Sequence, residues 1–291
     1  MPRNRGRRMS VWPRGSERLR ALALGLALGA ALPAGAEAPQ RVVSMNLCTD
    51  QLALMLAAPG QVISVTWLAH REDLSPMVEA ARGLPSNRGT AEDVAMLQPD
   101  LVLAGRFTTV ATVEMLTRLG IPVVRFQPEN SLDDVEASIA RMGAVLGREA
   151  EAAARIQAFR RDRAALAAHI APLPPERAAL YSARGFTSGP ASLAGDILRA
   201  AGLANIAEEL GIGRGGLLAL EALILADPDR LVLGRRHPGR SEAQALLDHP
   251  VLGAMPAHAR GTPMADRDWI CGTPHVLAAV IALIAAREDG A

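Results

Sequence analysis

The stretch EDVAMLQPDLVL, residues 92–103, decides the fold, because a second stretch of the same design, EALILADPDRLVL, follows at residues 221–233. In each stretch a glutamate precedes a Pro-Asp pair by seven residues, and a short apolar run suited to a strand comes next. A proline ends a helix and biases the residue before it toward extended backbone. The chain therefore carries one helix–turn–strand unit twice, which predicts two similar α/β lobes.

Strands alternate with helices on both sides of these two units. The apolar and β-branched runs predict strands at 41–44, 62–65, 101–103, 121–124, 178–181 and 231–233. Helical spacing of apolar residues predicts helices at 51–56, 113–119 and 192–201. Alternation at this interval is typical of parallel sheets covered by helices.

The middle of the chain differs, because residues 148–170 contain neither glycine nor proline. Apolar residues recur there at helical spacing, interrupted by Arg163, and are Ala152, Ile156, Phe159, Leu166 and Ile170. Pro172, Pro174 and Pro175 then stop the helix. We predict a linking backbone helix at 148–171, between an N-terminal lobe at 37–147 and a C-terminal lobe at 172–291.

The first 36 residues have the pattern of a secretory signal peptide. An apolar run from Ala21 to Leu32 ends in Ala34-Gly35-Ala36, and it follows a basic leader that contains Arg3, Arg5, Arg7, Arg8, Arg14, Arg18 and Arg20. We expect cleavage near Ala36 and a periplasmic protein, with an uncleaved anchor as the alternative. The Arg7-Arg8 pair leaves the general secretory and twin-arginine routes open. No cysteine stands at the cleavage point, which argues against a lipid anchor.

The charge of the remaining chain argues against nucleic-acid binding. Without the leader, 24 basic residues face 29 acidic residues, a net charge of −5. No later run is long and apolar enough to cross a membrane. Aromatic residues make up only 3% of the chain, so an aromatic outside a core position is informative.

Several segments, in this order, resemble the helical-backbone (class III) periplasmic binding proteins of ABC importers, the carriers of vitamin B12, ferric siderophores and haem. The resemblance spans nearly all of residues 40–287. The long central helix carries part of it, and the other segments are RVVSMNLCTDQLALML (41–56), GTAEDVAMLQPDLVLAG (89–105), LGIPVV (119–124), YSARGFTSGPASLAGDILRAAGLANIA (181–207) and HPVLGAMPAHARGTPM (249–264), which resembles the closing strand region. The resemblance implies two lobes with a ligand cleft between them.

The same resemblance implies a function. We expect a substrate-binding protein that captures a metal chelate, either a ferric siderophore or a cobalamin-type corrinoid, and delivers it to the permease of an ABC importer with its ATPase. We expect a monomer without a resident cofactor. Haem transport, and a periplasmic sensor or adaptor on the same fold, are the alternatives.

The carboxyl ends of parallel strands hold the loops that bind ligands, so site residues should follow strands. Aromatic faces would hold a flat chelate, and arginines would pair with its anionic groups. The candidates that follow strands or lie near the presumed cleft are Trp67, Arg106, Phe107, Arg184, Phe186, Trp269 and His275. Each aromatic could instead pack within its own lobe. The Phe-Thr-Ser-Gly surroundings of Phe186 resemble a cleft loop of the vitamin B12 carrier, whereas residues 215–218 offer no further aromatic.

The two repeated glutamates form a second candidate site. In the resembling family an acidic residue at this place on each lobe docks onto arginines of the permease, which would assign docking to Glu92 and Glu221. Ordinary helix chemistry is the alternative, since an acid in the first turn suits the helix dipole. Thr90 supplies an N-cap that fits this alternative for Glu92, but no such residue closely precedes Glu221.

No pattern predicts catalysis or a protein-bound metal. The six histidines show no HxH or HExxH spacing and are His70, His169, His237, His249, His258 and His275. The chain has no GxSxG elbow for Ser188 to serve, so an exported hydrolase is the weakest alternative. Haem carriers of this class often use Tyr or His on the iron, and Tyr181 is the only tyrosine.

The two cysteines, Cys48 and Cys271, leave three interpretations open. We place Cys48 in the loop after the first strand and Cys271 in the last loop before the terminal helix. Export to an oxidising compartment favours a disulfide between them, provided that the Cα atoms come within about 7 Å. Two free thiols, or a thiolate that contacts a metal chelate, are the other interpretations.

Overall fold

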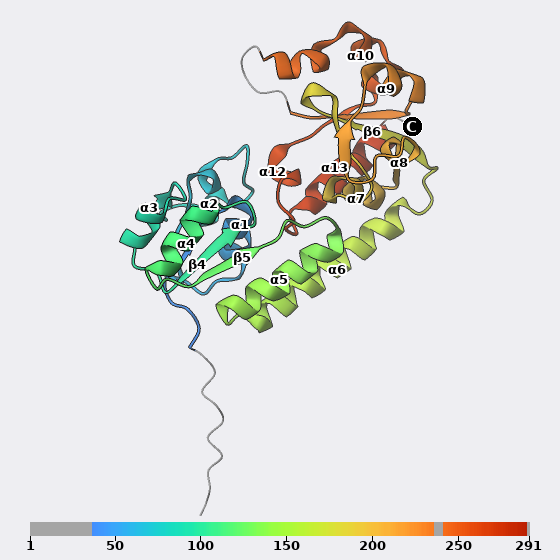
Figure 1. Ribbon diagram of the computed structural model, residues 1–291. Helices are drawn as coiled ribbons and strands as arrows, with labels where there is room; N and C mark the ends of the chain where they lie inside the picture. The colour runs from blue at the N-terminus through green and yellow to red at the C-terminus, as the bar shows by residue number, and fades with distance from the viewer. Residues whose placement is uncertain (1–36, 236–240, 290–291) are drawn as a thin grey trace, which may run out of the picture. The chain divides into compact units, whose positions relative to one another are not determined.

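Two parallel β-sheets organise the structure, a computed structural model that describes residues 37–235 and 241–289 (Figure 1). The first sheet has the order β3-β2-β1-β4-β5. Its strands are β1 (Val42–Ser44), β2 (Val62–Thr66), β3 (Ser86–Asn87), β4 (Leu101–Gly105) and β5 (Val123–Phe126). The predicted signal peptide and His237 lie outside the described residues.

The second sheet repeats the topology of the first. Its order is β11-β10-β6-β8, so β8-β6-β10-β11 corresponds to β2-β1-β4-β5, and every pairing in both sheets is parallel. Its strands are β6 (Glu176–Tyr181), β8 (Leu203–Asn205), β10 (Arg230–Leu233) and β11 (Thr262–Pro263). A separate antiparallel pair joins β7 (Phe186–Ser188) to β9 (Gly215–Leu217). The predicted α/β class with parallel sheets is confirmed.

Helices connect the strands. They are α1 (Leu47–Leu56), α2 (Val78–Ala81), α3 (Ala91–Met96), α4 (Val110–Arg118), α5 (Leu132–Leu146), α6 (Glu149–Ile170), α7 (Leu193–Ala200), α8 (Ile206–Glu209), α9 (Leu220–Ala226), α10 (Pro250–Ala254), α11 (Pro256–Ala259), α12 (Asp266–Trp269) and α13 (Val276–Asp289), with 3₁₀ turns η1 (Trp67–His70), η2 (Ala183–Gly185) and η3 (Glu242–Asp248). Side-chain N-caps start several of them, among them Asn46, Thr90, Ser131 and Ser192.

Three sequence-based placements were wrong. Cys48 is the second residue of α1 rather than part of a loop, because Asn46 caps the helix immediately after β1. Trp269 ends the short helix α12 and does not lie in an irregular loop. The segment 249–264 is mostly α10 and α11, each with a proline at its first position, and contributes a strand only at β11.

The repeated helix–turn–strand unit is confirmed in atomic detail. The turn after each helix contains a non-glycine residue with positive φ directly before the proline, Gln98 at 49° and Asp227 at 42°. The aspartate after each proline accepts a backbone N–H from the start of the neighbouring central strand. Asp100 accepts from Arg41 at 3.0 Å, and Asp229 accepts from Arg177 at 2.8 Å.

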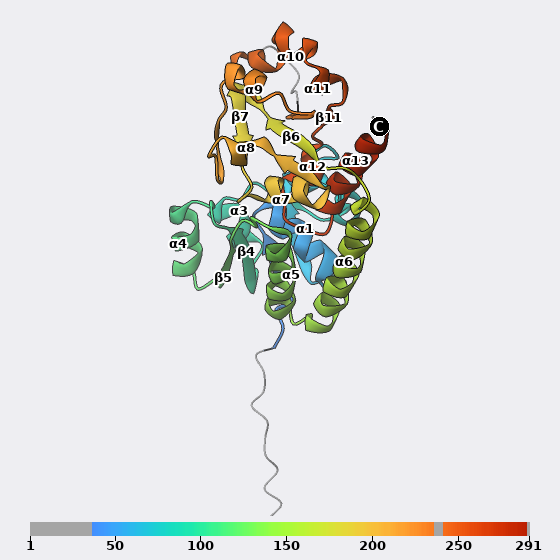
Figure 2. The ribbon, with the colours of Figure 1, turned by 90° about the vertical axis from the view of Figure 1, so that its right-hand side faces the viewer.

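The long helix α6 packs against α5, with which it lies side by side in both views (Figures 1 and 2). It runs from Glu149 to Ile170, within one residue of the predicted bounds at each end. The two helices approach closely, because a Cβ on Gly143 would lie 2.4 Å from the Cβ of Ala152. Any side chain larger than glycine at 143 would therefore separate them.

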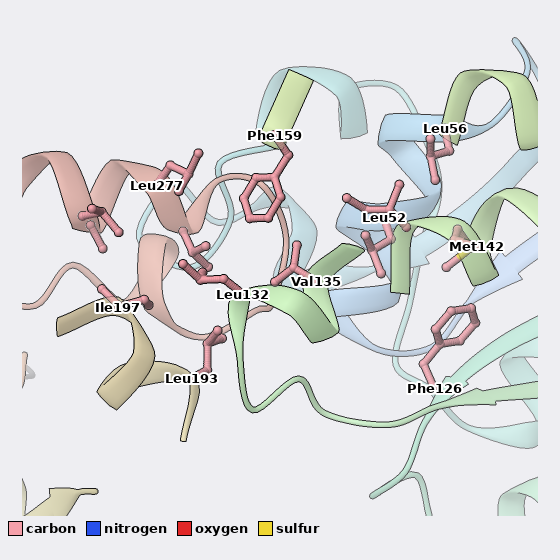
Figure 3. Packing of buried hydrophobic residues seen from close by; sticks show 14 of the residues in the cluster. Leu52, Leu56, Phe126, Leu132, Val135, Met142, Phe159, Leu193, Ile197 and Leu277 are labelled. Carbon is pink, nitrogen blue, oxygen red and sulfur yellow. The ribbon is translucent and has the colours of Figure 1, made fainter. Parts of the chain in front are cut away.

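One apolar cluster connects the two sheets around this helix pair. It contains Val42 and Leu103 of the first sheet and Leu180 and Val232 of the second. It also contains Phe159 of α6, whose ring Figure 3 shows beside Val135 and Leu132 of α5. From Ala38 onward the chain forms one compact unit. The predicted lobe boundaries at 147 and 171 stay predictions.

Replacing Phe159 tests how strongly α6 holds this cluster together. Phe159→Ala should lower the free energy of unfolding by about 3–5 kcal/mol, because it removes a fully buried ring and leaves a cavity. Urea unfolding with an unchanged m-value is the measurement. Leu166→Ala on the same helix, where the side chain is only half-buried, is the control and should cost clearly less.

Candidate functional site

The order of the first sheet reverses between β1 and β4, and the loops after these two strands diverge from that point. In open parallel sheets such a switch point is where ligands bind. Asn46 follows β1, and its side chain accepts the backbone N–H of Cys48 at 3.0 Å. Gly105 ends β4, and a Cβ there would lie 2.8 Å from the Asn46 amide nitrogen, so the close approach of the two loops requires glycine.

A cavity of about 190 Å³, open to solvent, lies at this switch point. Residues after β1, β4 and β5 line it, together with the segment before α13; they are Asn46, Cys48, Thr49, Leu52, Gly105, Arg106, Phe107, Phe126, Gln127, Pro128, Glu129, Ile270 and Gly272. The predicted candidates Arg106 and Phe107 are therefore brought together on one wall.

Several polar groups of the cavity wall make hydrogen bonds within the protein. Arg106 donates to the Gln127 side-chain oxygen at 3.1 Å, and Arg125 donates to the Arg106 carbonyl. Burial raises the pKa of Glu129, whose carboxylate accepts the Ser138 hydroxyl at 2.5 Å. The wall thus offers a guanidinium and amide groups beside the Phe107 ring. Phe107 is 83% exposed.

Cys48 and Cys271 form a disulfide with Cα atoms 5.0 Å apart. The bond joins α1 to the segment before α13, and Thr273 adds a hydrogen bond to the Gln51 side chain at 3.2 Å. Gly272 lies against Glu129, since a Cβ there would come within 2.4 Å of the Glu129 Cβ. These contacts hold Ile270 and Gly272 in the cavity wall.

Trp67 and Trp269 do not line the cavity. Trp67 begins η1 after β2, and its residue is 48% exposed with the Arg71 guanidinium 5.8 Å from the ring centroid. Trp269 is half-buried and packs against the main apolar cluster. Trp269 is therefore a packing residue of the protein interior, whereas Trp67 keeps about half of its surface in solvent.

Arg184, Phe186 and His275 also lie outside the cavity lining. Arg184 is exposed in η2 with φ of 60°, and Phe186 begins β7, where its ring lies close to Gly215 of β9. Phe186 is 47% exposed. The His275 Nε2 atom lies 3.1 Å from the Met77 sulfur, and burial lowers the pKa of this histidine.

Sequence reasoning missed Asn46, Gln127, Glu129 and Ile270. The first three lie within three residues of the end of β1 or β5, so the rule that site residues follow strands could have found them. Ile270 carried no such signal, because it reaches the cavity only through the fold and the adjacent disulfide.

Other candidate chemistry is limited. Among residues 37–235 and 241–289, no three His, Cys, Asp or Glu side chains are grouped so that they could hold a metal ion. In the same part of the chain no helix is long and apolar enough to cross a membrane. Tyr181 is completely buried, and its hydroxyl has no hydrogen-bond partner among the residues that the structure describes.

Comparison with known proteins now identifies the family. A family model described as periplasmic binding protein matches residues 42–262. The chain belongs to this family of solute-binding transport proteins. The resemblance stated from the sequence is confirmed.

A curated relative from Halobacterium salinarum, named a cobalamin-binding protein, is 32% identical over 200 residues, which cover 67% of this chain and 54% of the relative. The chain thus spans about half the length of the curated relatives it matches. A periplasmic haem-binding protein from Pseudomonas aeruginosa shares the fold with a TM-score of 0.71 at 22% identity, covering 87% of this chain and 94% of that one. The periplasmic vitamin B12-binding protein of Vibrio cholerae shares the fold with a TM-score of 0.64 at 15% identity, and the match covers 86% of this chain and 97% of that one.

The disulfide gives a direct chemical test. Protein that is purified without reductant and then unfolded should show no free thiol, and reduction should expose both Cys48 and Cys271. Thiol titration with a chromogenic reagent measures this. Two free thiols before reduction would contradict the bond.

Asp50 predicts a specific pH dependence. It is buried in α1 and accepts from Thr66, and desolvation raises its pKa from 3.8 to about 7. The folded state then binds the proton more tightly than the unfolded state, so the stability contributed by this group is full below about pH 4 and is lost as the pH rises through 7. Relative to Asp50→Asn, the unfolding free energy of the wild type should fall between these pH values. Parallel curves for the two proteins would exclude this role.

Proposed function

We propose that this protein captures a corrinoid of the cobalamin class in the periplasm and delivers it to the permease of an ABC importer. The observation that carries the proposal is the cavity at the switch point of the first sheet, with Phe107 exposed on its wall and Arg106 beside it. In a family of solute-binding proteins such a cavity is the expected place for the solute.

The chemistry of the wall suits a corrinoid. A corrin ring is flat and largely apolar, so it can cover an aromatic face that would otherwise stay in water. Its periphery carries neutral amides and a phosphate. Asn46 and Gln127 offer amide partners, and Arg106 offers a guanidinium for the phosphate. The cobalamin-binding relative supports this class over a ferric siderophore.

The haem alternative has less support from the residues. Among the described residues that line the cavity there is no tyrosine or histidine to ligate iron. Tyr181 is buried, and His275 is directed at Met77. The fold shared with haem-binding proteins at 22% identity does not change this argument.

Delivery would depend on Glu92 and Glu221. Both are exposed in the first turn of a short helix, α3 and α9. Within the described part of the chain neither carboxylate makes a hydrogen bond or an ion pair, so both are available to arginines of a permease. Ala219 provides no side-chain cap before Glu221, which leaves helix capping a weaker explanation there.

Ligand titration of the exported protein tests the proposal. Cyanocobalamin should bind with a micromolar or lower dissociation constant, measured by quenching of tryptophan fluorescence. Ferrioxamine B and haemin should bind more weakly. Phe107→Ala should weaken binding about tenfold or more, because a central aromatic contact contributes about 1–3 kcal/mol. Val110→Ala, an exposed apolar residue outside the cavity lining, is the matched control and should leave affinity unchanged.

The other outcomes each point to a different function. Selective binding of ferrioxamine B or of haemin would replace the corrinoid with that class. The protein could also bind none of the three ligands, and a strain that lacks it could take up all three normally. This result would favour the sensor or adaptor alternative.

A further inference from the structure

The two repeated helices expose more than their glutamates. Met96 is 82% exposed and Leu225 is 85% exposed, which places them among the most exposed large apolar residues of the described chain. Met96 follows Glu92 by four residues, and Leu225 follows Glu221 by four residues. Residues at this spacing lie on the same helix face, so each helix presents one acid and one apolar side chain together.

The opposite face of each helix is buried in the same way. Ala91 and Val94 of α3 join an apolar cluster with β1 and β4, and Leu223 of α9, with Leu220 against it, joins a cluster with β6 and β10. Met96 and Leu225 therefore point away from cores that are already complete. Packing among the described residues does not account for either side chain.

Equivalent contacts fix the carboxyl end of each helix. Arg41 donates to the Leu97 carbonyl at 2.7 Å and to the Gln98 carbonyl at 3.1 Å. Arg177 donates to the Asp227 carbonyl at 3.0 Å. These guanidiniums satisfy carbonyls that a helix end leaves without partners. Each acid–apolar pair is thus held on a pre-organised element, which reduces the entropy lost on binding.

We infer that Glu92 with Met96 and Glu221 with Leu225 form two equivalent docking patches, in which the apolar side chains are the anchors for a permease dimer. The inference rests on the proposed function. Two copies of one patch fit a partner with two equivalent faces, as a two-fold symmetric permease has. Each face should carry a basic group beside an apolar pocket.

The two components of a patch should act on different rate constants. Exposed charges mainly steer encounter and set salt dependence, whereas desolvated apolar anchors mainly slow dissociation. Glu92→Ala/Glu221→Ala should therefore lower the association rate and flatten its salt dependence. Met96→Ser/Leu225→Ser should raise the dissociation rate about tenfold and leave the salt dependence unchanged.

The experiment measures binding of the exported protein to the permease and ATPase of its own importer in lipid nanodiscs. Surface plasmon resonance gives the association and dissociation rate constants at several salt concentrations. Val110→Ser/Ile281→Ser is the matched control, because both residues are exposed and lie on other helices. All variants should keep the wild-type melting temperature and the wild-type affinity for cyanocobalamin.

Each result decides between defined alternatives. An unchanged dissociation rate in Met96→Ser/Leu225→Ser, with the glutamate variant impaired, overturns the anchors and leaves the proposed function standing. Wild-type protein that does not bind the importer overturns the proposed function and this inference together. A concentration-dependent dimer that the Met96→Ser/Leu225→Ser variant abolishes would assign the patches to a second copy of this chain.

Discussion

The packing of α6 against α5 and the surrounding apolar cluster is the constraint on which the rest of the structure depends. Gly143 lets the two helices approach, and Phe159 fills the space between them and the neighbouring elements. The Leu132 backbone N–H adds a hydrogen bond to Asp196 of α7 at 2.8 Å. Since residues of both sheets belong to the same cluster, moving one sheet against the other would expose buried apolar surface. The loops at the strand ends are therefore carried on a rigid base.

The two halves share a topology but use equivalent positions differently. Arg106 follows β4 and contacts Gln127 at the cavity, whereas Arg235 follows β10 and pairs with Asp73 at 2.8 Å. Gly105 approaches Asn46, and Gly234 approaches Ser182 in the same manner. One switch point thus carries a cavity, while an arginine at the other bonds to the loop after η1. A repeated fold therefore need not produce a repeated site.

The cavity itself combines segments from both ends of the chain. The loops after β1, β4 and β5 supply most of its wall, and the disulfide holds Ile270 and Gly272 against them. Glu129 follows β5 and lies against Gly272, so it is in contact with both parts of the wall. Its burial there raises the pKa of its carboxyl group. Part of the cavity wall is consequently held in place by a covalent bond that joins α1 to the segment before α13.

The sequence by itself determined the repeated helix–turn–strand unit, the alternation of strands and helices, the linking helix and the exposed glutamates, because these depend on spacing between near neighbours. It also placed Arg106 and Phe107 correctly after a strand. Only the tertiary structure decided which distant segments meet. It placed Ile270 and Gly272 in the wall and packed Trp269 inward, and it turned His275 toward Met77. The direction of a side chain in a loop depends on contacts with residues more than a hundred positions away, and local sequence patterns carry no information about those contacts.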